Sequence, residues 1–228
     1  MNRFIPAIAA AAVAVAGGAY WLTNTQTSAT ETAFSLPEIT NIQTVSSEGA
    51  ANEHGIVEMV MGSEDAPITI IEYASFTCPH CASFHENVLE PLKADYVDTG
   101  KVKFVFRDVY FDRYGLWASM VARCGGQEKF FGMTDILMKT QKDWTRAGDP
   151  VAISDSLRKT GRLAGLEDDQ LQACLQDEDK AKALVAWFQE NAAADDVNST
   201  PTLIIDGEKH SNMSYKDLKE ILDGKLGG

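Results

Sequence analysis

Ile68-Thr69-Ile70-Ile71-Glu72-Tyr73-Ala74, followed by Ser75-Phe76-Thr77 and then Cys78-Pro79-His80-Cys81, is the stretch that decides the fold of this chain. Its first seven residues are mostly β-branched or aromatic, which predicts a packed strand. From Pro79 onward apolar residues recur at the three- and four-residue spacing of a helix. Two thiols therefore stand where a strand passes into a helix, and a cysteine in such a place is expected to be reactive.

The spacing of Cys78 and Cys81 lets the two sulfurs close a small disulfide ring on the first turn of that helix. Unpaired backbone N–H groups and the helix macrodipole stabilise a thiolate there, so we expect a lowered pKa for Cys78. Pro79 suits the first helical position because it has no N–H group, and His80 can place a positive charge or a donor beside the sulfur. A stabilised thiolate is a good leaving group, which predicts an oxidising disulfide with Cys81 as the resolving thiol.

The length, composition and charge of the chain limit the kind of protein that contains this motif. The chain has 228 residues, 45% of them hydrophobic, and a formal net charge of -13. That length allows one sizeable domain or one domain with an insertion, and the acidity argues against nucleic acid and anionic membrane surfaces as partners. Residues 1–22 join a weakly basic start to an apolar run, which predicts a signal peptide or an uncleaved membrane anchor. Residues 23–52 are polar and predict a disordered tether.

The rest of the sequence predicts an α/β layout. A short strand is expected at 55–61, a helix after Cys78 that Pro91 bends or interrupts near Glu90, and a strand at 101–107 with one buried face. Further along we expect five helices, a strand, a turn and a final helix, at 114–124, 128–140, 151–160, 167–176, 179–194, 202–205, 206–207 and 214–222. A strand–helix–strand unit is thus separated from a terminal hairpin and helix by an all-helical stretch.

Two segments resemble the DsbA family of thiol oxidases, which have a thioredoxin fold. Phe76-Thr77-Cys78-Pro79-His80-Cys81, preceded by Ile71-Glu72-Tyr73, resembles that family's active site. Ser199-Thr200-Pro201-Thr202-Leu203-Ile204-Ile205-Asp206-Gly207 resembles its cis-proline loop and hairpin. The resemblance runs from about residue 55 to 228. It implies a thioredoxin-fold domain at 53–111 and 195–228, with a mixed β-sheet and flanking helices, interrupted by an all-helical inserted domain at 112–194.

The resemblance also implies roles for individual residues. Cys78 would be the nucleophile that forms mixed disulfides with substrate cysteines, Cys81 would resolve them, and His80 would tune Cys78. Pro201 would be cis and lie against the cysteine pair, and Thr200 would offer backbone groups to a bound peptide.

Glu72 has two interpretations. A charged residue in a strand is usually solvated. It shares parity with Ile68, Ile70 and Ala74, however, so the pleat of the strand turns it toward an apolar face. In the family an acid six residues before the first active-site cysteine lies under the site and helps proton transfer, and we expect this role for Glu72.

Cys124 and Cys174 form a second pair, and both lie on predicted core-facing sides of helices. Buried free thiols are one interpretation, because unpaired cysteine packs as a small hydrophobe. An exported chain with an even number of cysteines favours the other, a structural disulfide between them. The best-known members of the family lack this pair, so it departs from the family pattern.

These features together predict a periplasmic thiol:disulfide oxidoreductase that donates its Cys78–Cys81 disulfide to reduced, folding polypeptides. We expect it to be a monomer. The resemblance implies a DsbB-like membrane partner that reoxidises it. We expect no cofactor and no metal, because a site made of Cys78, Cys81 and His85 would lack a fourth ligand. A disulfide isomerase or reductase stays open, since threonine before the cis-proline also occurs in isomerases. Outside the enzymes, the alternative is a peptide-binding chaperone with a structural CxxC.

Overall fold

The computed structural model describes residues 50–227 of the chain. The predicted signal or anchor at 1–22, and all but the last three residues of the predicted tether at 23–52, lie outside the described residues. Among the described residues, every helix is too short or too polar to span a membrane. The described part forms one compact unit built around a five-stranded sheet.

The sheet has the strand order β1-β3-β2-β4-β5. Its strands are β1 Met59–Met61, β2 Ile68–Ala74, β3 Val102–Asp108, β4 Thr202–Ile205 and β5 Glu208–Ser211. β2 pairs in parallel with β3, and the other pairs are antiparallel. The α/β class and the mixed sheet predicted from the sequence are therefore confirmed.

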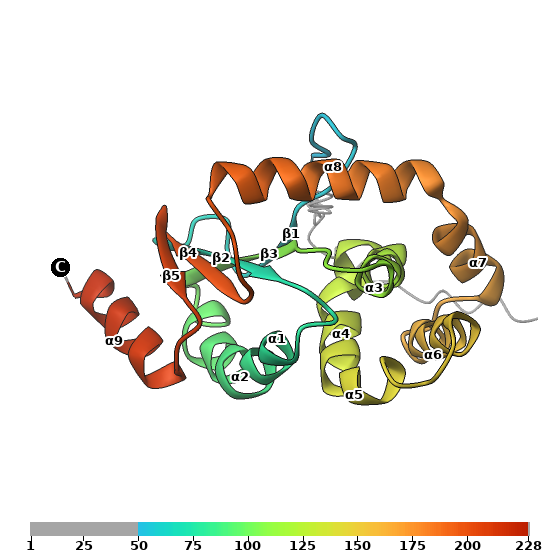
Figure 1. Ribbon diagram of the computed structural model, residues 1–228. Coiled ribbons are helices and arrows are strands. Elements are labelled where there is room, and N and C mark those ends of the chain that lie inside the picture. Colours follow the sequence, from blue (N-terminus) through green and yellow to red (C-terminus); the bar gives the residue numbers. More distant parts are fainter. Residues whose placement is uncertain (1–49, 228) are drawn as a thin grey trace, which may run out of the picture. The chain divides into compact units, whose positions relative to one another are not determined.

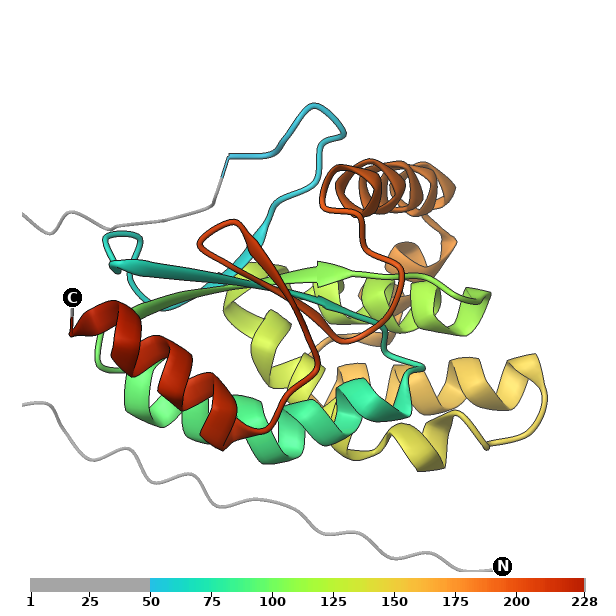
Figure 2. The ribbon, with the colours of Figure 1, turned by 60° about the vertical axis from the view of Figure 1, so that its left-hand side comes forward.

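Helices lie on both faces of this sheet (Figures 1 and 2). One face carries a single continuous helical segment, composed of α1 Pro79–Phe84, η1 His85–Leu89, α2 Glu90–Leu92 and η2 Lys93–Val97, together with α9 Tyr215–Leu226. The opposite face carries α8 Glu178–Ala194. The remaining helices come between β3 and α8 in the chain, and they are α3 Arg113–Cys124, α4 Gly126–Lys139, α5 Gln141–Trp144, α6 Pro150–Leu163 and α7 Asp168–Gln176. The helical insertion into the fold, between β3 and β4, is thus present.

One sequence prediction about these elements is wrong, and the structure adds detail to two others. The helix that starts after Cys78 continues through Pro91, and its geometry changes near Glu90 as expected, because the π-helical η1 ends at Leu89 and α2 begins at Glu90. β3 has the one fully buried face that was predicted, Val102, Phe104, Phe106 and Asp108, while on its other face Val105 is 3% exposed and Lys103 and Arg107 are partly buried. The last helix passes through Gly224 and ends at Leu226, because Leu226 packs on the core and Lys225 pairs with Asp206 at 3.2 Å.

The predicted turn between β4 and β5 is present at Asp206 and Gly207. Both residues have positive φ, 48° and 86°, as the tight turn of a hairpin requires. Asp206 also ties this turn to the start of β2, because the Thr69 N–H donates to its Oδ1 at 2.8 Å and its own N–H donates to the Thr69 carbonyl at 2.9 Å. The hairpin that follows Pro201 is therefore fixed against the strand that leads to Cys78.

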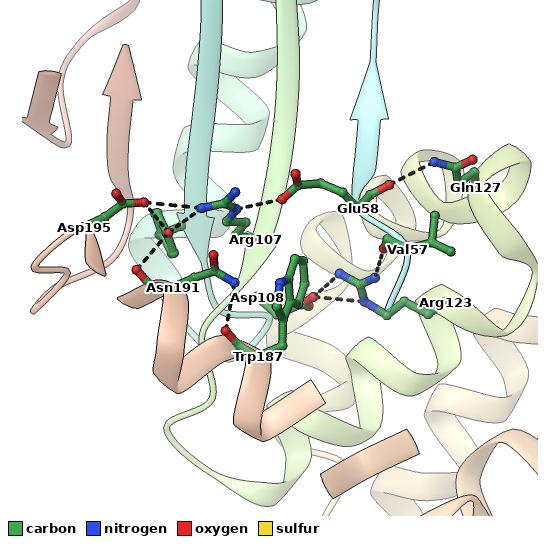
Figure 3. Close-up of polar contacts among 10 residues, drawn as sticks. Val57, Glu58, Arg107, Asp108, Arg123, Gln127, Trp187, Asn191 and Asp195 are labelled. Atoms are coloured by element: carbon green, nitrogen blue, oxygen red, sulfur yellow. Dashed lines mark hydrogen bonds and ion pairs between the residues drawn. The ribbon is translucent and has the colours of Figure 1, made fainter. Parts of the chain in front are cut away.

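Buried and partly buried polar contacts join the helical insertion to the sheet (Figure 3). Arg123 on α3 donates from Nη2 to Oδ2 of Asp108, at the end of β3, over 2.6 Å, and from Nη1 to the Val57 carbonyl over 3.0 Å. Arg107 on β3 lies between Glu58 at 2.7 Å and Asp195 at 3.3 Å, just after α8. Removing one partner of a buried ion pair such as Arg123–Asp108 usually costs about 3–5 kcal/mol, and the partly exposed pairs of Arg107 contribute less. These pairs fix α3 and α8 to the strands that carry the site.

Candidate active site

Cys78 occupies the junction between the loop after β2 and the first helix. It is the N-cap residue of α1, with extended φ of -84° and ψ of 117°, and Pro79 follows at the first helical position. Its N–H donates to the Ser75 carbonyl at 3.1 Å, which holds the loop in a tight turn. Cys78 is 8% exposed, whereas Cys81 is fully buried.

Cys78 and Cys81 have opposite ionisation behaviour. A hydrogen bond from the Cys81 thiol lowers the pKa of Cys78 to about 5 against the opposing effect of burial, and the Thr200 side chain and the backbone N–H groups of Cys81 and His80 add to the lowering. Burial raises the pKa of Cys81 far above its usual range, and the hydrogen bond to Cys78 and the charge of Glu72 raise it further. At neutral pH the reduced pair therefore holds a thiolate at Cys78 and a thiol at Cys81.

The Thr200-Pro201 peptide bond is cis, and it brings the second predicted segment to the first. The Cys78 Sγ lies 3.5 Å from the Thr200 carbonyl oxygen, across 122 residues of sequence. Pro201 is buried and Thr200 is half-buried, and β4 begins at the next residue. The structure thus brings together the residues predicted for the nucleophile and for peptide binding.

Glu72 is fully buried on β2, on the same side as Ile68, Ile70 and Ala74. Its Oε2 lies 2.9 Å from Nε2 of His85, the first residue of η1, and the two side chains form a buried pair. The sequence analysis did not connect His85 with Glu72. The signal was its position four residues after Cys81, which places both side chains on one helix face, above the strand that carries Glu72.

Gln141 is a second residue that the sequence analysis missed. It begins α5, is 3% exposed, and donates from Nε2 to the carbonyl oxygens of Phe76 at 2.8 Å and Cys78 at 2.9 Å. A side chain of the helical insertion thus fixes the loop that presents the cysteines. No spacing or motif pointed to it, because its partners are backbone atoms more than 60 residues earlier in the chain.

His80 and Pro79 are exposed beside Cys78. His80 acts on the Cys78 thiolate through its backbone N–H. Its exposed ring remains free to meet a molecule that approaches the sulfur.

Cys124 and Cys174 are joined by a disulfide between α3 and α7. Both residues are half-buried, and the pair closes a loop with a sequence separation of 50. In the same structure Cys78 and Cys81 are both free.

One group of side chains in residues 50–227 has ligand atoms close enough together to share a metal ion. It consists of Glu53, His54 and Glu190, whose atoms lie within 4.8 Å of one another. The two glutamates are exposed, and His54 already pairs with Glu190 at 2.7 Å. Exposed acidic groups of this kind are common without a metal, so we assign no metal to them.

The comparisons with known proteins agree with this geometry. The sequence profile of a family described as thioredoxin matches residues 55–224. A relative from Rickettsia bellii, named for a protein-disulfide oxidoreductase activity, is 31% identical over 73% of this chain and 63% of its own length, so the chain spans less than two thirds of that relative. Disulfide bond formation protein D of Bacillus subtilis is 25% identical over 74% of this chain and 77% of its own length. The crystal structure of alpha-DsbA1 from Wolbachia pipientis superposes with a TM-score of 0.68 and 28% identity, covering 75% of this chain and 91% of that one.

Proposed function

This chain belongs to the thioredoxin family and is DsbA-like, and from that premise we propose that it is a thiol:disulfide oxidoreductase that donates its Cys78–Cys81 disulfide to folding proteins. The observation that carries the proposal is that the pKa of Cys78 is lowered while the pKa of Cys81 is raised. A disulfide whose reduced form contains a stable thiolate is easily reduced and is therefore a good oxidant. The lowered pKa of Cys78, about 5, is the source of that stability.

Transfer proceeds through a mixed disulfide. A substrate thiolate attacks the Cys78 Sγ, the Cys78–Cys81 bond breaks, and the Cys81 sulfur leaves with the electron pair and takes up a proton. A second substrate thiolate then attacks the substrate sulfur of the mixed disulfide, and Cys78 leaves as a thiolate. The substrate loses two electrons and gains a disulfide, and the pair on the enzyme is reduced. Attack at Cys78 is supported by the exposures, 8% for Cys78 and 0% for Cys81.

Thr200 and Pro201 support the binding of the substrate polypeptide beside Cys78. The backbone of Thr200 lies next to the sulfur, and a peptide in an extended conformation can pair with free backbone groups of such a loop. The exposed Pro79 and His80 form the neighbouring surface. Glu72 assists the proton exchange of Cys81. This role is supported by the charge of Glu72, which raises the pKa of the Cys81 thiol.

Location and partners complete the proposal. Residues 1–22 would export the chain to the periplasm, where reduced polypeptides with cysteines are its substrates. A DsbB-like membrane protein would reoxidise it, and it would act as a monomer. The names of the relatives support disulfide chemistry.

The test is the oxidation of a reduced, unfolded disulfide protein by the oxidised chain and by its Cys78→Ser variant. We expect the native protein to restore activity to the substrate and the variant to do nothing. A double variant, Cys124→Ser with Cys174→Ser, is the matched control and should retain oxidation. Equal activity of the native protein and Cys78→Ser would refute the enzyme function and favour a chaperone. Faster rescue of a scrambled substrate than of a reduced one would favour an isomerase.

A further inference from the structure

Tyr73 lies on β2 next to Glu72, and its side chain points to the other face of the sheet, toward α8. The side chain is fully buried and packs with Val109, Ile204 and Phe188. Disulfide transfer gives no direct role to this residue, yet a buried phenol hydroxyl needs a hydrogen-bond partner. The partners that it has therefore show what the residue holds together.

The Tyr73 hydroxyl belongs to a polar group at the end of α8. It donates to Oδ2 of Asp195 at 2.5 Å and lies 3.2 Å from the Asn191 carbonyl oxygen. Nη1 of Arg107 on β3 donates to the same hydroxyl at 2.9 Å and to Asp195 at 3.3 Å, and its Nε donates to Glu58 at 2.7 Å (Figure 3). We call Tyr73, Arg107 and Asp195 the Tyr73 cluster. The cluster connects two central strands of the sheet to the end of α8.

Both donors of the Tyr73 cluster are in place at neutral pH. Burial raises the pKa of Tyr73 well above its usual range, and the hydrogen bond to Asp195 raises it further, so the phenol stays protonated. Burial lowers the pKa of Arg107, but hydrogen bonds with Glu58 and Tyr73 more than offset this effect. The guanidinium therefore stays charged, and the contacts of both side chains with Asp195 persist.

Asp195 is the C-cap residue of α8 and begins the segment that leads to Pro201. Thr200 follows it by five positions. Within this segment the Val197 N–H donates to the Ala192 carbonyl at 2.7 Å, which holds the chain in a tight turn against the end of the helix. A movement of Asp195 is therefore transmitted to Thr200 over a short and constrained length of chain.

The strand that carries Tyr73 also leads to the cysteine pair. Tyr73 lies opposite Thr202 in the antiparallel pairing of β2 with β4, and Cys78 follows Tyr73 by five residues. The Cys78 Sγ is 3.5 Å from the Thr200 carbonyl oxygen. Tyr73 thus lies beside the strand that follows the cis-proline loop, and its hydroxyl binds the residue at which that loop begins. Both ends of the loop are fixed to the strand that leads to Cys78.

We propose that Tyr73 is a positioning residue for the dithiol, which acts through Asp195 and Arg107 to hold Thr200 beside the Cys78 sulfur. The proposal rests on the proposed function, because it concerns the same cysteine pair. The Thr200 side chain helps to lower the pKa of Cys78. A loop that moves away from Cys78 leaves the thiolate less stable, so the disulfide becomes a weaker oxidant.

The test is Tyr73→Phe, which removes the hydroxyl and keeps the buried ring. Two quantities are measured: the pKa of Cys78, by ultraviolet titration of the thiolate, and the equilibrium of the Cys78–Cys81 disulfide with glutathione. We expect a higher pKa and an equilibrium constant for reduction that is about two- to ten-fold smaller, the range for weakening one hydrogen bond. A role limited to stability would lower the free energy of unfolding and leave both quantities unchanged.

Tyr96→Phe is the matched control. Tyr96 is 1% exposed, its hydroxyl donates to Oδ1 of Asp223 at 2.5 Å, and Lys219 donates to that hydroxyl at 3.0 Å. It therefore has the same combination of buried phenol, carboxylate and cation as the Tyr73 cluster, but its partners belong to α9. Loss of this hydroxyl should lower stability and leave the Cys78 pKa and the glutathione equilibrium at their native values.

Two further comparisons show whether the effect passes through Asp195 and Thr200. Asp195→Ala removes the acceptor and should behave as Tyr73→Phe does, whereas Asp195→Asn keeps an acceptor for the phenol and should stay closer to the native protein. Tyr73→Phe combined with Thr200→Val should have the Cys78 pKa of Thr200→Val alone, because the loop then has no hydroxyl to displace. Additive shifts would show that Tyr73 acts by another route and would refute the proposal.

The outcomes separate this proposal from the proposed function. If Tyr73→Phe has the native Cys78 pKa and glutathione equilibrium, the positioning role is refuted and the proposed function stands. If Cys78→Ser oxidises a substrate as well as the native protein does, the proposed function is wrong, and the pKa of Cys78 in Tyr73→Phe still decides the positioning role. A raised pKa in Tyr73→Phe together with a native one in Tyr96→Phe supports it.

Discussion

The two cysteine pairs of this chain differ in every property that controls sulfur chemistry. Cys78 and Cys81 are free, lie three residues apart at the start of a helix, and have pKa values moved in opposite directions. Cys124 and Cys174 are joined, belong to two different helices and close a long loop. The first pair has donors that stabilise one ionised sulfur, and the second links two helices of the insertion. We infer that the local surroundings, and not the presence of a disulfide, assign the redox role.

The largest expected effect on turnover comes from replacing one cysteine of each pair with serine. In Cys81→Ser the Cys78 thiolate can attack a peptide disulfide, but no second thiol can resolve the product. We expect a stable mixed disulfide at Cys78 and loss of turnover to the uncatalysed level. Mass mapping of the adduct measures this. Cys174→Ser should keep turnover, and an adduct found mainly at Cys124 would contradict the comparison.

Removal of the second pair should lower stability while activity remains. For a loop with a sequence separation of 50, the chain-entropy relation gives a loss of roughly 4 kcal/mol in the free energy of unfolding. Denaturant unfolding of Cys124→Ser with Cys174→Ser, compared with the native protein under oxidising conditions, measures it. Unchanged stability would show that the disulfide does not constrain the unfolded chain as we suppose.

The pH dependence of stability should distinguish the reduced first pair from the second. The folded pKa of Cys78, about 5, is depressed below its ordinary value of 9.0. Its contribution is therefore fully present above about pH 9 and is lost as pH falls toward about pH 5. Cys81 acts in the opposite sense, because its raised folded pKa keeps it protonated in the native state, and it lowers stability only as pH rises past its ordinary value of 9.0, where the unfolded chain ionises.

Unfolding of protein in which Cys78 and Cys81 are reduced and Cys124–Cys174 is intact, measured across that window, should thus show stability rising with pH relative to Cys78→Ser. The Cys124–Cys174 disulfide has no titrating thiol and should add no slope. Parallel curves for the native protein and Cys78→Ser would contradict the ionisation of Cys78.

A smaller effect is expected from Thr200→Val, which keeps the shape of the side chain and removes its hydroxyl. Because the Thr200 side chain helps to lower the pKa of Cys78, this variant should raise that pKa, by less than about one unit for a single partly exposed hydrogen bond. Ultraviolet titration of the thiolate measures the shift. Thr99→Val, on the helix turn before β3, is the control and should leave the pKa unchanged.

Much of the site could be predicted because it depends on short, local sequence patterns. The strand before Cys78, the capping position of Cys78, the burial of Glu72 and the hairpin at Asp206-Gly207 all follow from local periodicity and turn chemistry. The cis bond before Pro201 followed only from resemblance to a family. These features need no knowledge of how distant segments meet.

The features that were missed depend on contacts between distant segments. Gln141 binds two backbone carbonyls of the active-site loop, and backbone partners leave no mark on the sequence. His85 looked isolated because its partner, Glu72, belongs to a strand 13 residues earlier. The extension of the last helix to Leu226 depended on the packing of Leu226 on the core and on the pairing of Lys225 with Asp206.

The most direct test of the account is the order in which the two disulfides are reduced. Fully oxidised protein is equilibrated with glutathione mixtures of increasing reducing strength, free thiols are alkylated, and peptides are mapped by mass. The account predicts that Cys78 and Cys81 become alkylated in mixtures that leave Cys124–Cys174 intact, because the Cys78 thiolate stabilises the reduced state of its own pair. Reduction of Cys124–Cys174 first, or of both pairs together, would contradict it.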